Sequence, residues 1–138
     1  MAAPPIEGVL EAAVYADDLD AAEAFYGGVL GLEVVIRQEN RHVFFRCGET
    51  IVLVFRAEAT KVPPKPGALP VPPHGAEGAG HVCFAATAEA LKDWKKRLTG
   101  AGVEIEADFN WPNGARSIYV RDPGGNSVEF AEPKLWAT

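Results

Sequence analysis

Three residues with metal-ligating side chains each lie in a short apolar segment typical of a strand. Glu11 lies in the segment 8–16, His81 begins "HVCFAA", and Glu129 lies in "NSVEFAE". Because side chains alternate between the two faces of a strand, all three are expected on the face opposite the apolar residues that a helix would cover. One imidazole and two carboxylates suit a divalent transition ion and leave positions open for water or substrate. The sequence therefore predicts a metal site formed by Glu11, His81 and Glu129.

The two halves of the sequence repeat one predicted order of elements: a strand, a helix and three further strands. The first helix lies in "DDLDAAEAFYGG", where Gly27 and Gly28 are expected to end it, and the second lies in "TAEALKDWKKRLTGAG". His81 follows Glu11 by 70 residues, so the two occupy equivalent positions, which pseudo-twofold symmetry would bring together. The other predicted strands are "LEVVIR", "HVFFRC" and "TIVLVF" in the first half and "VEIEADF" and "RSIYVR" in the second.

A single α+β domain is expected to cover residues 1–138. Its parts are a first βαβββ module at about 8–56, a connector at 57–79, a second module at about 80–132 and a tail at 133–138. Six prolines between Pro63 and Pro73 exclude helix and central strand there and predict a stiff or extended segment. Neither module is large enough to bury an adequate core alone, so the two are expected to fold together.

The composition excludes several classes of partner. The net charge is −6 with no block of Lys or Arg, whereas nucleic-acid binding requires a basic face. No apolar run approaches the ~20 residues of a membrane span, and the N-terminus lacks the basic and apolar regions of a signal peptide. Cys47 and Cys83 lie in predicted strands and are interpreted as reduced core thiols. We therefore expect a cytoplasmic protein that binds neither nucleic acid nor membranes.

Further residues are candidates for lining a substrate pocket. Tyr119, Ser117 and Arg121 share one face of the strand "RSIYVR". Tyr119 is predicted to donate a hydrogen bond to an activated substrate, and Arg121 either binds a substrate carboxylate or pairs with nearby acids. Trp111 is expected at the pocket mouth or in the core. His74, at the end of the connector, either covers the site as an acid or base or makes only local hydrogen bonds.

The paired βαβββ order, together with "DLDAAEAFYGGVLGL" and "RDPGGNSVEF", resembles the vicinal oxygen chelate superfamily of glyoxalase I, bleomycin-resistance proteins and extradiol dioxygenases. The resemblance implies a half-open, cup-like mixed β-sheet with helices on its outer face, and a homodimer. It also implies a small oxygen-bearing substrate chelated by a divalent Ni, Co, Mn, Fe or Zn ion. The family's ligand positions match Glu11, His81 and Glu129, and by this resemblance Glu129 is also a catalytic candidate, beside Tyr119.

The resemblance leaves the reaction open. Glyoxalase I takes a further carboxylate ligand from the last strand of its first module, where this chain has Val52, Leu53 or Val54. A redox-inert ion would suit isomerase or lyase chemistry, whereas ring cleavage needs iron or manganese. The alternatives are a metal-free drug-binding protein of the bleomycin-resistance type and a domain that has lost its chemistry. The sequence leaves open whether Glu11 meets His81 within one chain or across two.

Overall fold

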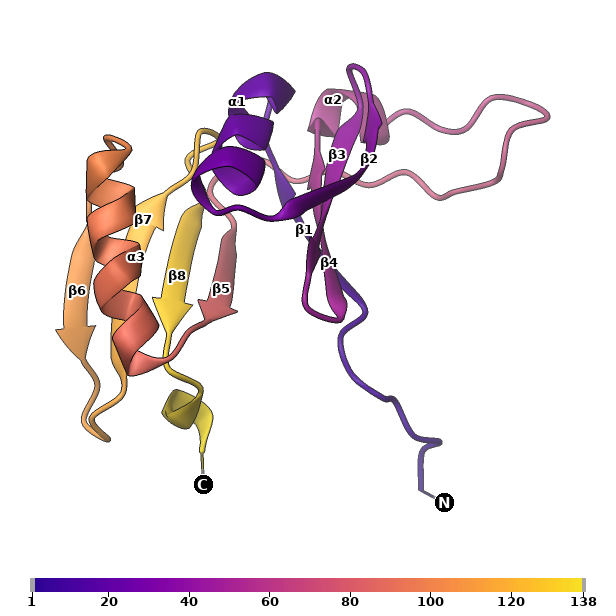
Figure 1. The fold of residues 1–138 in the computed structure, drawn as a ribbon. Coiled ribbons are helices and arrows are strands. Elements are labelled where there is room, and N and C mark those ends of the chain that lie inside the picture. Colours follow the sequence, from indigo (N-terminus) through magenta and orange to yellow (C-terminus); the bar gives the residue numbers. More distant parts are fainter. Residues whose placement is uncertain (1, 138) are drawn as a thin grey trace.

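Two open four-stranded mixed sheets, each with helices on one side, form the structure, a computed structural model that describes residues 2–137 (Figure 1). The strand orders are β1-β4-β3-β2 and β5-β8-β7-β6, and in each sheet the outer strand named first is parallel to its neighbour. The α+β class and the two βαβββ modules are thereby confirmed. The strands are β1 (Glu11–Tyr15), β2 (Glu33–Gln38), β3 (His42–Cys47), β4 (Thr50–Phe55), β5 (His81–Ala85), β6 (Ala107–Asn110), β7 (Arg116–Arg121) and β8 (Ser127–Ala131). The helices are α1 (Leu19–Glu23), η1 (Ala24–Val29), α2 (Ala57–Thr60), α3 (Ala88–Gly100) and η2 (Pro133–Trp136).

The first helix does not end at its glycines as predicted. Asp18 caps α1 by accepting a hydrogen bond from the Ala21 amide at 3.0 Å, and the helix then continues through both glycines as the π-helical η1. Neither Gly27 nor Gly28 has a positive φ, so neither acts as a left-handed cap. Gly27 instead allows close packing, because a Cβ placed there would lie 3.5 Å from the Phe45 ring.

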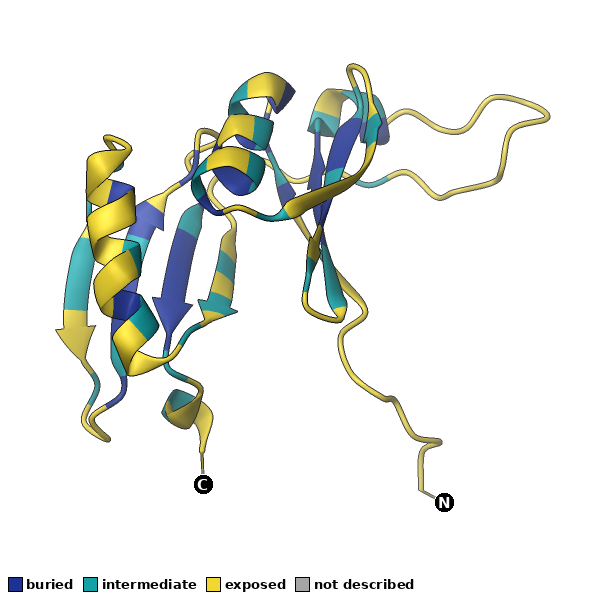
Figure 2. Ribbon diagram, viewed as in Figure 1, coloured by how far each residue is buried: buried dark blue, intermediate teal, exposed yellow. Residues whose placement is uncertain are grey.

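Two other segments also differ from the predictions. The strand predicted from Val103 forms only from Ala107, because Val103 and Ile105 pack against the hydrophobic core before β6 begins. The connector starts with the short helix α2 and then runs without regular structure, and its proline-rich part projects away from the sheets as an exposed loop (Figure 2). The connector is therefore extended, as its prolines predicted.

A single hydrophobic core lies between the sheets and the helices. Every second residue of a strand points into this core, as Val52 and Val54 do on β4 and Val128 and Phe130 on β8. Helix α3 contributes Leu91 and Leu98. The residues between them, Glu129 among these, therefore face the opposite side of the sheet, as the alternation predicted. That opposite face is available for a functional site.

A buried polar network joins the two modules. The Tyr26 hydroxyl donates to Asp122 Oδ2 at 2.6 Å, and burial raises the pKa of this tyrosine far above its usual range. Asn126 donates from Nδ2 to Asp122 Oδ2 and to the Tyr15 carbonyl, each at 2.9 Å, and accepts from the Gly80 amide at 2.8 Å. Asp122 Oδ1 also accepts from the Asn126 amide. The network therefore holds the end of β1 beside the start of β5.

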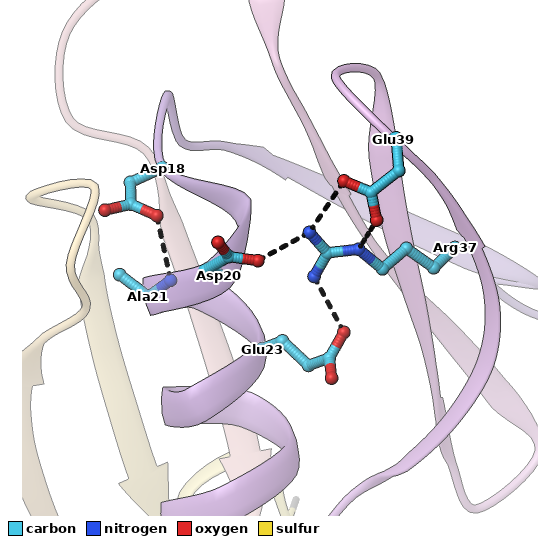
Figure 3. A network of polar contacts seen from close by, with 6 residues as sticks. All are labelled: Asp18, Asp20, Ala21, Glu23, Arg37 and Glu39. Carbon is cyan, nitrogen blue, oxygen red and sulfur yellow. Dashed lines mark hydrogen bonds and ion pairs between the residues drawn. The ribbon is translucent and has the colours of Figure 1, made fainter.

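A second, exposed polar network ties the first helix to the edge strand of its sheet (Figure 3). The Arg37 guanidinium on β2 donates to Asp20 at 2.6 Å, to Glu23 at 2.9 Å and to Glu39 at 2.8 Å. Hydrogen bonds to these carboxylates, Glu39 first, raise the pKa of Arg37. Since exposed ion pairs are weak, this network orients the hairpin more than it stabilises it.

Gly124 of the second module lies against Tyr15 and Ala16 of the first, and we expect its replacement by alanine to destabilise the protein. A Cβ at this position would lie 2.8 Å from the Tyr15 carbonyl oxygen and 3.0 Å from Ala16 Cβ, so the backbone must shift. We expect Gly124→Ala to lower the free energy of unfolding by about 1–3 kcal/mol in urea titrations. Gly28→Ala is the control, because no atom lies within 4 Å of the added Cβ. Equal stability of the two variants would contradict the close approach.

Candidate functional site

His81 and Glu129 lie side by side on neighbouring strands of the second sheet. His81 Nε2 is 3.3 Å from Glu129 Oε1, and His81 Nδ1 is 3.0 Å from the Ser127 carbonyl oxygen. Because a carbonyl can only accept, the hydrogen bond places a proton on Nδ1. In the neutral imidazole, Nε2 then carries a lone pair that faces the carboxylate oxygen. Such a pair of acceptors requires a proton or a cation between them.

The carboxylate of Glu129 is held from its other side by a chain of two hydrogen bonds. The Ser117 hydroxyl donates to Glu129 Oε2 at 2.6 Å, and Trp111 Nε1 donates to the Ser117 Oγ at 2.7 Å. Glu129 is 5% exposed and Ser117 is fully buried. The structure thus brings together the predicted site residues His81, Glu129, Ser117 and Trp111, and Tyr119 joins them as described next.

Tyr119 and Cys83 flank Glu129 in the sheet, because each is its cross-strand partner. Partial loss of hydration on the sheet surface and, secondarily, the Glu129 carboxylate raise the pKa of Tyr119 and of Cys83 to about 12 each. Both groups therefore keep their protons near neutral pH, so Tyr119 can donate a hydrogen bond and Cys83 is no thiolate nucleophile. The prediction of a core thiol is wrong for Cys83, which is exposed, whereas Cys47 packs against the core.

Aromatic rings extend from His81 across the same face. The Tyr119 ring is near-parallel to that of His81, with centroids 6.2 Å apart, and to that of Phe109, with centroids 5.8 Å apart. The Trp111 ring meets Phe109 edge-on at 4.9 Å. Phe109 is 38% exposed and was not predicted as a site residue, although its alternation with Trp111 along the chain placed both on one face.

Glu11 lies in the other sheet, away from His81 and Glu129. The Tyr15 end of β1 adjoins the start of β5, and Glu11 lies four residues before Tyr15, about 13 Å along the strand. Within residues 2–137, no group of three or more His, Cys, Asp or Glu side chains is placed to hold a metal ion. A single chain therefore brings together two members of the predicted trio.

The register of the two sheets identifies the residue of the first module that corresponds to Glu129. Glu11 pairs with Ile51 as His81 pairs with Ser127, so Leu53 corresponds to Glu129. Leu53 is buried. Of the three residues considered for a further ligand, Leu53 is therefore the one that shares a face with Glu11, and its side chain cannot ligate.

Arg121, which was considered for substrate binding, is already paired with an acid, and so is Arg116 on the same strand. Arg121 donates to both oxygens of Glu106, at 2.7 and 3.0 Å. Arg116 donates to both oxygens of Asp108, at 2.9 and 2.8 Å, and these bonds hold the pKa of Asp108 well below its usual range. The alternative prediction for Arg121, pairing with a nearby acid, is confirmed.

An aromatic cluster that was not predicted covers the corresponding face of the first sheet. Phe55 contacts the rings of His42, Phe44 and His74 edge-on, with the shortest centroid distance, 4.6 Å, to His74. His74 Nδ1 is 2.7 Å from the Tyr15 hydroxyl, so His74 anchors the connector to the first module. Burial and the nearby Arg41 lower the pKa of His42. Two adjacent phenylalanines interrupt the alternation of apolar and polar residues in the strand of His42. The sequence therefore does not show which residues of this strand share a face.

The open pair of βαβββ modules, with a histidine and a carboxylate on one inner face, places the chain in a known family. The family described as Glyoxalase/Bleomycin resistance protein/Dioxygenase superfamily matches residues 8–130, so the chain belongs to it, and the resemblance found in the sequence is confirmed.

No helix within residues 2–137 is long and apolar enough to cross a membrane.

Two solved structures illustrate the similarity. The chain is 46% identical to a lactoylglutathione lyase from Agrobacterium tumefaciens, with a TM-score of 0.89 over 96% of this chain and 98% of that one. It is 21% identical to a glyoxalase/bleomycin resistance protein/dioxygenase from Nocardioides, with a TM-score of 0.71 over 96% of this chain and 85% of that one, a likeness of fold alone. No curated protein matches the sequence.

Proposed function

We propose that the protein is a divalent-metal-dependent enzyme of this superfamily that acts on a small substrate with two neighbouring oxygens. The observation that carries the proposal is the contact of His81 Nε2 with Glu129 Oε1 at 3.3 Å, while a backbone carbonyl holds the proton on Nδ1. Metal-ligating histidines in proteins almost always have their second ring nitrogen held in this way. When bound, the ion would serve as a Lewis acid for the substrate oxygens.

The donor set fits a metal site that two copies of the chain complete together. His81 and Glu129 would supply two ligands from one copy, and Glu11 would supply the third from the second copy. Leu53 provides no further ligand, so the site differs from the ligand pattern that the resemblance attributes to glyoxalase I. A symmetric homodimer would contain two such sites.

The residues of this chain also suggest how a substrate would be handled. Tyr119 keeps its proton near neutral pH and would donate a hydrogen bond to a substrate oxygen. Glu129, beside Tyr119, is the carboxylate that would accept a substrate proton. The 46% identity to a lactoylglutathione lyase favours lyase or isomerase chemistry over ring cleavage.

A second candidate function is metal-free binding of an aromatic drug. The aromatic cluster around Phe55 and the acidic net charge of −6 favour this function for a cationic aromatic ligand. Stoichiometric binding of such a ligand by metal-free protein, without any uptake of metal, would support it over the metalloenzyme.

Mixing two inactive variants tests the shared site. We expect the wild type to bind about one Ni²⁺ or Co²⁺ ion per chain, and Glu11→Gln and His81→Ala each to lose this binding. Refolding the two variants together should restore about a quarter of the sites, because half of the dimers would then contain one intact site. The control for mixing is refolding of His81→Ala together with Glu104→Gln. The site residues of the Glu104→Gln chain are unchanged.

The outcomes separate the parts of the proposal. Metal uptake by the wild type without restoration in the Glu11→Gln and His81→Ala mixture would refute the sharing of the site between copies. No uptake of Ni, Co, Mn, Fe or Zn ions by the wild type would refute the metalloenzyme and leave drug binding as the candidate function.

A further inference from the structure

We propose that Trp111 and Ser117 are positioning residues that restrict Glu129 to ligation through a single oxygen, Oε1. The inference rests on the proposed function, because it concerns how the same carboxylate meets the ion. Three features carry it: the direction of the hydrogen bonds, the burial of the groups, and the rigidity of the segment that holds Trp111.

The direction of the hydrogen bonds follows from the chemistry of the donors. An indole N–H can only donate, so Trp111 Nε1 must use a lone pair of Ser117 Oγ as its acceptor. The single hydroxyl proton of Ser117 is then directed to Glu129 Oε2 at 2.6 Å. A hydrogen bond from a hydroxyl to a carboxylate is of the strong, charge-assisted kind. Ser117 thus holds Oε2 toward β7, and Oε1, which is 3.3 Å from His81 Nε2, is the oxygen placed for an ion.

Burial leaves the chain of hydrogen bonds without competitors. Ser117 is fully buried and Glu129 is 5% exposed, so water cannot readily replace either partner. Both residues lie on adjacent antiparallel strands, β7 and β8, whose register fixes their separation. No buried side-chain nitrogen or oxygen within residues 2–137 lacks a hydrogen-bond partner.

The segment that carries Trp111 is itself fixed at several points. The Trp111 amide donates to the Ala115 carbonyl at 2.7 Å, and the Gly114 amide donates to the Trp111 carbonyl at 2.8 Å. Asn113 donates from Nδ2 to the carbonyls of Lys134 and Leu135 in η2, at 3.2 and 3.3 Å. The C-terminal helix therefore fastens the turn, and the turn holds the indole against Ser117.

Ligation through one oxygen matters because the proposed substrate needs two positions on the ion. A carboxylate that ligates through both oxygens occupies an additional position. With Glu129 limited to Oε1, three protein ligands leave room for two substrate oxygens. The chain of hydrogen bonds would thus keep two coordination positions of the ion free for the substrate. It would also maintain the affinity of the protein for the ion.

Cobalt-loaded protein reports the ligation directly. We expect Ser117→Ala to free Oε2, so that Glu129 ligates through both oxygens and the visible Co²⁺ absorption weakens as the coordination number rises. The affinity for Co²⁺ should also fall by about 10–100-fold, as is usual when a group supporting a ligand is removed. Trp111→Phe should give a smaller change of the same sign, because Ser117 keeps its hydroxyl. Trp136→Phe, which alters an 85% exposed tryptophan, is the matched control.

A Ser117→Ala spectrum and Co²⁺ affinity identical to those of the wild type would overturn the inference. A readout on metal-free protein separates this failure from failure of the proposed function. The indole N–H resonance of Trp111, assigned by its loss in Trp111→Phe, should shift in Ser117→Ala and in Glu129→Gln without any metal. If wild-type protein takes up no ion, the proposed function fails and the positioning of a ligand fails with it. Unchanged indole resonances would refute the hydrogen-bond chain itself.

Discussion

Replacing Glu129 by glutamine is expected to lower the affinity for divalent ions by about 100-fold or more, because loss of a ligand should cost at least as much as loss of a group that supports one. The replacement keeps the shape of the side chain and removes its charge. In the metal-free protein the new amide suits its surroundings: its oxygen can accept from Ser117, and its N–H can donate to His81 Nε2. The fold should therefore be unharmed, and only the binding of the ion should be lost.

Calorimetric titration of metal-free protein with Ni²⁺ or Co²⁺ measures the loss, and urea unfolding measures the stability. Glu104→Gln, an exposed change of the same chemistry outside the site, should leave both quantities unchanged. Wild-type affinity in Glu129→Gln would show that the carboxylate is no ligand. A large loss of stability would show that its charge serves the fold.

Replacing Asn126 by alanine is expected to produce a large loss of stability, about 1–3 kcal/mol, because removing one partner from a buried hydrogen-bond network costs about that much. The side chain of Asn126 is 1% exposed and bonds to Asp122, to the Tyr15 carbonyl and to the Gly80 amide. Its removal would take a hydrogen bond from the buried Asp122 carboxylate, from the half-buried Tyr15 carbonyl and from the Gly80 amide. The affected groups also join the two modules.

Urea unfolding followed by tryptophan fluorescence measures this effect. Asn110→Ala is the matched control, because Asn110 bonds to the Gly114 carbonyl at an exposed position and its loss should cost much less. Similar losses in the two variants would contradict the role of Asn126 as the connection between modules. Since Gly80 precedes His81, metal affinity should also fall in any Asn126→Ala protein that remains folded.

The repeat and the alternation of side chains could be predicted from sequence because both are local. The strand containing Glu129 alternates without interruption, so its inner face could be assigned, and the contact with His81 follows from pairing of β5 with β8. Gly27 and Gly28 misled the helix prediction, because neither ends the helix and the small size of Gly27 serves packing against Phe45 on β3. Propensity alone does not distinguish these two uses of glycine.

Other parts of the site depend on contacts between distant segments. Trp111 and Ser117 were both candidates, but their hydrogen bond depends on a turn closed by the Ala115 carbonyl. The position of Glu11 depends on how β1 lies against β5, which is decided by the Asn126 network. The aromatic cluster around Phe55 depends on a histidine from the connector, 19 residues further along the chain. No local pattern carries information of this kind.

The correspondence between Leu53 and Glu129 shows that equivalent positions of the two modules carry different chemistry. Once two copies of a unit are fused in one chain, each can change without its twin. The second module has a charged residue and its supporting hydroxyl at this position, whereas the first has a buried aliphatic side chain. The two modules thus have separate roles although they share one core, and a substitution at Leu53 can change an apolar surface of the first module without touching the histidine and carboxylate of the second.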